Sequence, residues 1–196
     1  MENNQSTESY KSILSTKIEK TWENFNLNNI NKDSKFWKIN FLEANAVGQI
    51  GESFFKELFS INNIKIKDTK EIIHDEYDIL IEKSNLKIDI KTARKGKTNN
   101  TFQFNGIDPN YNYDYIICFG ITDDEFYIKI IDKKNEIKYD HSKRSYYYYG
   151  ENSSYEKPIK LVNMNPNNMN NKKLTLSTKK MDDFSKFNIF VNFLKA

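Results

Sequence analysis

The sequence predicts an α/β protein in which a central mixed β-sheet is flanked by α-helices. Residues 8–60 repeat apolar side chains at helical spacing, and from Ile64 onward the repeat changes to the alternation typical of β-strands. The segment YDYIICFGI (residues 113–121) is apolar on both faces, which indicates a strand in the middle of a sheet. Helices followed by a run of strands favour a layered α/β arrangement.

The composition suits one soluble globular domain spanning residues 1–196. Its 196 residues are 38% hydrophobic and 29% charged with mixed signs, and the formal net charge is +3. No apolar run is long enough to span a bilayer, and the N-terminal MENNQSTESY lacks the basic and apolar regions of a signal peptide. Cys118 is the only cysteine and cannot form an internal disulfide, so we expect a reducing, cytoplasmic setting without membrane contact.

Two helical regions are expected within residues 8–60. Residues 8–26 form an amphipathic pattern, and residues 36–60 form a second one in which Gly48 and Gly51 weaken the middle. The second region is therefore expected to be either two helices or one helix with a close packing contact.

A sheet core is expected within residues 64–131. IKIKD, YDILIE and LKIDIKT alternate as short strands, with a hairpin turn at residues 83–85. YDYIICFGI and EFYIKIID follow, joined by a turn at Asp123-Asp124. In residues 132–196 the pattern weakens: Tyr146–Tyr149 and residues 163–173 are interpreted as loops, and residues 181–195 as a final helix or strand.

The segment YDILIEKSNLKIDIKTARKG contains the residues with the clearest chemical role. Side chains two apart in a strand project to the same side, so Asp89 and Lys91 share a face. Asp78 opens the preceding strand, and a hairpin would bring its carboxylate beside Asp89. Two such carboxylates favour a hard divalent cation, usually Mg²⁺, to which the Ile90 backbone carbonyl can add a ligand. Lys91 can then orient a water and offset charge on a phosphate.

A helical carboxylate is expected to complete this site. Glu52, in GQIGESFFKELF, precedes Asp78 by about the length of a helix end, a loop and a strand, so it is expected to be a further ligand of the same metal. Glu43 is the reserve candidate.

This arrangement resembles the PD-(D/E)xK nuclease superfamily, and the resemblance covers roughly residues 45–130. Asp78 matches the first Asp of the superfamily pattern, Asp89-Ile90-Lys91 its acid-x-Lys, and Glu52 its helical acid. Tyr77 stands where many members have proline. Downstream, FQFNGIDPNYNYDYIICFGI is similar to the segment after the active-site hairpin of several type II restriction enzymes, and Gln103 within it is a candidate ligand or phosphate contact.

The resemblance implies a restriction-endonuclease-like fold with residues 64–131 as its catalytic core, and a Mg²⁺-dependent, sequence-specific cleavage of double-stranded DNA. A homodimer is implied because two-fold symmetry presents one active site to each strand of a palindrome. A cognate DNA methyltransferase is the expected partner, and residues 132–196 are expected to recognise DNA or form the dimer. The candidate DNA-contacting residues are Arg94, Lys95, Lys97, Gln103, Lys143 and Arg144.

Several alternatives remain open at this level. Asp89 and Lys91 could form the solvent face of a strand, and Glu52 could be an ordinary exposed helix residue. Within the superfamily, a Holliday-junction resolvase or a modification-dependent nuclease is possible, and a catalytically idle DNA-binding protein on the same fold is a further alternative. His74 and His141 are too isolated to suggest a zinc site, and Cys118 is interpreted as core.

Overall fold

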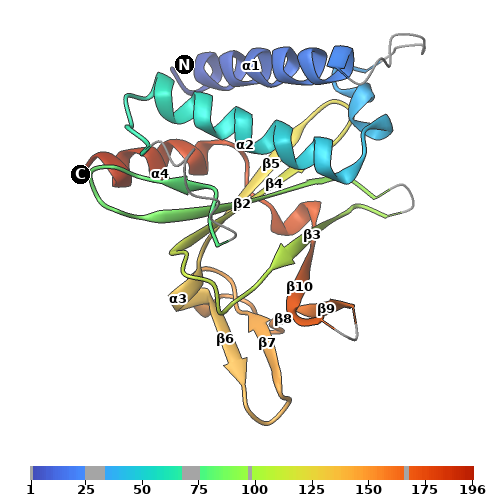
Figure 1. The fold of residues 1–196 in the computed structure, drawn as a ribbon, viewed down its shortest axis with the longest axis vertical. Helices are drawn as coiled ribbons and strands as arrows, with labels where there is room; N and C mark the ends of the chain where they lie inside the picture. Colours follow the sequence, from blue (N-terminus) through green and yellow to red (C-terminus); the bar gives the residue numbers. More distant parts are fainter. Residues whose placement is uncertain (1, 25–33, 68–75, 97–98, 166–167) are drawn as a thin grey trace.

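The computed structural model describes residues 2–24, 34–67, 76–96, 99–165 and 168–196. The chain is a mixed α/β protein in which the long helices lie on one side of a four-stranded sheet and further small sheets lie on the other (Figure 1). The elements are, in chain order, α1 (Glu2–Asn24), η1 (Trp37–Phe41), α2 (Ala44–Ile61), β1 (Ile79–Leu80), β2 (Lys87–Arg94), β3 (Thr101–Ile107), β4 (Tyr115–Ile121), β5 (Phe126–Asp132), α3 (Lys133–Glu136), β6 (Ile137–Asp140), β7 (Ser145–Tyr148), η2 (Glu151–Ser153), β8 (Ile159–Lys160), β9 (Val162–Asn165), β10 (Asn168–Ser177), η3 (Thr178–Lys180) and α4 (Ser185–Lys195).

The central sheet has the strand order β1-β2-β4-β5. β2 runs antiparallel to β1 and parallel to β4, and β4 runs antiparallel to β5, so the predicted mixed sheet is confirmed. Residues 64–67 extend the sheet beyond β1 through the Ile66–Ile81 bridge. The predicted order of strands around the hairpin at residues 83–85 is therefore correct, although β1 itself contains only two residues.

α1, α2 and α4 cover one face of this sheet because packing against it removes their apolar side chains from water. Ile50, Phe54 and Phe55 of α2 are essentially inaccessible and pack with Ile88 and Phe119 of the sheet. α2 lies close to β2 at Gly51, where a Cβ atom would lie 1.8 Å from Oγ1 of Thr92. Gly51 is thus the close packing contact that the sequence allowed, and α2 continues through both glycines as a single helix.

The opposite face of the sheet is covered by β-structure. β3 leaves the central sheet and pairs with β10, which in turn pairs with β9. Phe102 and Phe104 of β3, together with Leu174 and Leu176 of β10, enclose Ile116 and Cys118 of β4 in a second core. Cys118 is fully buried, as expected.

Two segments interpreted as loops are strands. Tyr146–Tyr149 lies largely in β7, where Tyr148 is fully buried, and the described part of residues 163–173 lies in β9 and β10. Asparagine has low intrinsic strand preference, and here pairing with the distant β3 outweighs it. Residues 181–195 end in a helix, α4, rather than a strand. In the described part of the chain, every helix is too short or too polar to cross a membrane.

The two glycines of α2 provide a test of the helix–sheet contact. We expect Gly51→Ala to lower the free energy of unfolding by about 1–3 kcal/mol, because the added methyl group collides with Thr92 and must push α2 away from β2. Gly48→Ala is the matched control, since nothing lies within 4 Å of its Cβ position, and it should stabilise the helix by about 0.5–1 kcal/mol. Chemical denaturation measures both, and equal effects of the two substitutions would contradict the contact.

Candidate active site

The β1–β2 hairpin brings Asp78 to the edge of β2. The Asp78 amide donates a hydrogen bond to the Ile88 carbonyl at 3.0 Å, and its carboxylate Oδ2 accepts one from the Ile90 amide at 2.6 Å. The carboxylate therefore takes the place of a further strand residue beside β2. This fixes Asp78 next to the peptide unit that joins Asp89 and Ile90, as the sequence predicted.

Asp89 and Lys91 form a buried ion pair on the face of β2 that is turned toward β3. Lys91 Nζ lies 2.8 Å from Asp89 Oδ1, Asp89 is only 4% exposed, and the Lys91 side chain is 21% exposed. The alternative of a solvent face is therefore wrong for Asp89, whose side chain lies between the central sheet and the second core.

The electrostatics of this pair follow from its burial. Burial raises the pKa of Asp89 to about 7, the positive charge of Lys91 opposes that rise, and the negative charge of Asp78 adds to it. Burial by itself would lower the pKa of Lys91, but Asp89 and Asp78 outweigh it and the pKa is raised. Lys91 is thus held as a cation beside a carboxyl group whose pKa is raised.

A β-bulge in β3 forms the wall opposite Lys91. Between the pairs Lys172–Ile107 and Leu174–Phe104, β3 contains one residue more than β10. Gly106 lies in this bulge with φ +78°, and a Cβ atom there would lie 3.7 Å from Lys91 Nζ. The Gly106 amide also donates to the Met164 sulfur at 3.3 Å, so β9 reaches the same region. The glycine allows the backbone to pass close to the ammonium group.

Tyr113 is a polar residue of this region that the sequence did not single out. Its hydroxyl is buried and has no hydrogen-bond partner in the described part of the chain. Burial raises the pKa of Tyr113, and the negative charges of Asp89 and Asp108 raise it further, so the hydroxyl stays protonated near both carboxylates. A tyrosine in an aromatic segment carries no local signal of such a position, which only the fold reveals.

Glu52 is the helical acid that the structure turns toward this cluster. Burial raises the pKa of Glu52 and the charge of Asp78 adds to the rise, while Lys56 and Lys91 act in the opposite direction. Its side chain remains 39% exposed and lies 3.8 Å from Lys56 Nζ. Glu43, the reserve candidate, is an exposed residue at the start of α2. Of the two acids, Glu52 is the one in electrostatic contact with Asp78 and Lys91.

The donor set around β2 is composed of oxygen atoms. The Ile90 carbonyl points to the same sheet edge as the Ile90 amide, because the N–H and C=O of one strand residue point the same way, and that amide contacts Asp78. Asp78, Asp89 and this carbonyl suit a hard divalent cation such as Mg²⁺. Within the described ranges, no three His, Cys, Asp or Glu side chains are already grouped to hold a metal ion, so Glu52 is not part of a preassembled cluster.

The predicted DNA-contacting residues fall into separate places. Arg94 lies on the helical face and donates hydrogen bonds to the backbone carbonyls of Asn40 at 2.8 Å and Leu42 at 2.9 Å, which gives it a structural role. Lys95 directly follows β2, and Gln103 is exposed on β3, where it donates to Asn105. Lys143 and Arg144 lie in the β6–β7 turn, and Lys97 lies outside the described residues.

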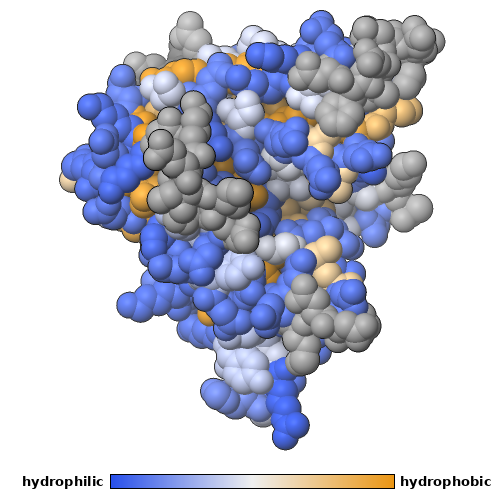
Figure 2. Space-filling view, viewed as in Figure 1, coloured by the Kyte–Doolittle hydropathy of each residue, from blue (hydrophilic) through white to orange (hydrophobic). Residues whose placement is uncertain are grey.

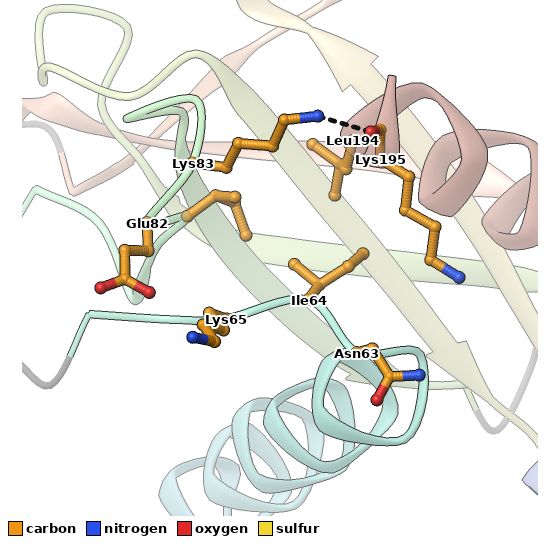
Figure 3. A pocket seen from close by; sticks show the side chains of 8 residues that line it. Asn63, Ile64, Lys65, Glu82, Lys83, Leu194 and Lys195 are labelled. Atoms are coloured by element: carbon orange, nitrogen blue, oxygen red, sulfur yellow. Dashed lines mark hydrogen bonds between the residues drawn. The ribbon is translucent and has the colours of Figure 1, made fainter.

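A surface pocket lies away from these residues, at the ends of α2 and α4 (Figure 3). There Lys83 Nζ donates a hydrogen bond to the Lys195 carbonyl at 2.6 Å, which ties the β1–β2 turn to the end of α4. Its lining residues are Asn63, Ile64, Lys65, Ile81, Glu82, Lys83, Leu194 and Lys195. None of the acids proposed for the site is among them, so the site is defined by its buried charges rather than by this hollow.

Comparison of the chain with family models, with curated proteins and with solved structures finds no match.

Lys91→Met tests the coupling within the ion pair. Removal of the ammonium takes away the charge that holds the pKa of Asp89 down, so we expect that pKa to rise above about 7. Carbon-13 NMR of the Asp89 carboxyl group measures the change. Lys87→Met is the control on the same strand, because the Lys87 ammonium lies over the Tyr77 ring instead. An unchanged Asp89 titration in Lys91→Met would show that the two side chains do not interact in solution.

Proposed function

We propose that this chain is a Mg²⁺-dependent phosphodiesterase that cleaves nucleic acid. The observation that carries the proposal is the juxtaposition of Asp78 with a buried Asp89–Lys91 pair on adjacent strands. A buried carboxyl group with a raised pKa beside a second carboxylate is energetically unfavourable unless a bound cation compensates the negative charge. Ionisable groups perturbed in this way are common at functional sites.

Within that class, the chain is proposed to be a type II restriction endonuclease that cuts double-stranded DNA at a specific sequence. The arrangement of β1, β2 and the parallel β4, with α2 on one face, supports a restriction-endonuclease-like fold. A homodimer, a cognate DNA methyltransferase and a cytoplasmic location belong to the same proposal.

Each residue has a role that its environment supports. Asp78, Asp89 and the Ile90 carbonyl would hold Mg²⁺, which supplies Lewis-acid stabilisation of phosphate charge and a more acidic bound water. Lys91 keeps its proton because two carboxylates surround it, so it is suited to orient the attacking water and to stabilise negative charge on the phosphate. Glu52, whose pKa is raised at the edge of the site, is suited to accept a proton from that water.

Alanine substitutions of the two aspartates test the site. We expect Asp78→Ala and Asp89→Ala each to reduce Mg²⁺-dependent cleavage of unmethylated phage or plasmid DNA by at least a hundredfold, because each removes a metal ligand. Lys91→Arg should not preserve activity, since a planar guanidinium places its charge differently from a compact ammonium.

Asp124→Ala is the matched control for these variants, because Asp124 is an exposed acid in the turn between β4 and β5. It should cut at the wild-type rate. Near wild-type cutting by either site variant, with the fold verified by circular dichroism, would refute the site.

Cleavage of linear duplex DNA compared with cleavage of four-way junctions distinguishes a restriction endonuclease from a Holliday-junction resolvase. We expect linear duplex to be cut into discrete fragments at symmetric positions on both strands, because two sites related by a dyad act on a palindrome. The comparison uses four-way junctions built from the same sequence. Preferential cutting of the junctions would replace restriction with Holliday-junction resolution and leave the metal site in place. Binding without any cutting would indicate a catalytically idle DNA-binding protein.

A further inference from the structure

The small sheet formed by β6, β7 and β8 projects from the end of the molecule opposite α1 (Figure 1). Ile137 and Tyr148 anchor it in the second core, while residues 141–144 at its turn are exposed. Figure 2 shows hydrophilic residues over this end of the molecule. The hairpin thus presents polar side chains away from the body of the protein.

One face of this sheet gathers lysine side chains around a tyrosine. Lys138 of β6 is paired with Tyr147 of β7, and Tyr147 is paired with Lys160 of β8, so the three side chains form a row on one face. Lys143 from the turn lies over the same ring, with Nζ 4.9 Å from the centre of Tyr147. We call Lys138, Lys143, Lys160 and Tyr147 the lysine face.

The charge of the lysine face is largely uncompensated. Lys138, Lys143 and Lys160 are exposed, and within the described residues neither Lys138 nor Lys160 forms an ion pair. Lys143 Nζ lies 3.1 Å from Asp140, whose carboxylate is also engaged by Ser142 in the turn. Glu151 of η2 is paired with Lys186 of α4. Exposed lysines around an aromatic ring form a surface suited to the phosphates of a nucleic acid.

The other face of the hairpin contacts the β3–β4 loop and β10 through Tyr146. The Tyr146 hydroxyl donates to Asn110 Oδ1 at 3.2 Å, in the loop between β3 and β4 that also contains Tyr113. Lys172 of β10 lies with Nζ 5.7 Å from the Tyr146 ring. The hairpin is therefore on the same side of the central sheet as Asp89 and Lys91, not on the side of the helices.

We propose that the lysine face binds the phosphate backbone of the duplex DNA that the candidate active site would cleave. This inference rests on the proposed function, because it supplies a substrate contact for the same reaction. It assigns DNA-binding roles to Lys138 and Lys160, which the sequence did not single out, and to Tyr147, and it extends the role expected for Lys143.

The salt dependence of DNA binding tests this surface. The triple variant Lys138→Gln, Lys143→Gln and Lys160→Gln is compared with the wild type on one linear duplex across a series of KCl concentrations, without divalent cations so that no cleavage occurs. The slope of log affinity against log salt is negative, and each lost phosphate contact makes it shallower by about 0.9. The slope of the triple variant should therefore be shallower than that of the wild type by about 2.7. Binding should weaken to a similar degree for cognate and unrelated sequences, because phosphate contacts carry no sequence information.

The matched control changes three exposed lysines on the helical side, Lys20, Lys65 and Lys195, to glutamine. It removes the same charge from the molecule and should leave the slope unchanged. Equal slopes for the triple variant and the wild type, or equal losses in both triple variants, would overturn the proposal for the lysine face while leaving the nuclease proposal intact. Failure of the wild type itself to bind or cut duplex DNA would overturn both.

Discussion

The buried carboxyl group of Asp89 is the constraint around which the site is organised. A carboxylate that is 4% exposed is unfavourable without compensation, and Lys91 supplies it at 2.8 Å. Asp78 works against this compensation, because its own negative charge raises the pKa of Asp89. The arrangement brings charges together that would be destabilising in an ordinary core, which is characteristic of functional sites. The bulge at Gly106 and the buried Tyr113 hydroxyl belong to the same enclosure.

The helical layer helps to form the candidate site through the close contact between α2 and β2. Because Gly51 has no side chain, α2 can approach Thr92 of β2, and the next residue, Glu52, is carried toward Asp78 and Lys91. A glycine that weakens a helix locally thus serves to position an acid. Arg94 lies on the same face of β2 as Thr92. Its guanidinium donates hydrogen bonds to the backbone carbonyls of Asn40 and Leu42, which join η1 to α2.

The face of the sheet opposite the helices combines the site with two outward-reaching elements. β9 contacts the bulge beside Lys91 through Met164, and the β6–β7 hairpin connects to the β3–β4 loop through Tyr146. Under the proposed function, charges on a rigid strand with surface elements extending beyond them would suit a long polymeric substrate. The other face of the sheet packs against α1, α2 and α4 in the larger hydrophobic core.

The sequence by itself determined the helical region, the central strands and the grouping of Asp78, Asp89 and Lys91, because helical and strand periodicity and a short hairpin are local properties. Tertiary structure decided the rest. β10 pairs with β3, which is distant in the chain, and this pairing outweighs the low strand preference of asparagine. The choice of Glu52 over Glu43, the structural role of Arg94 and the position of Tyr113 depend on which segments meet across the sheet. No local pattern encodes those contacts, since they join residues that are far apart in the chain.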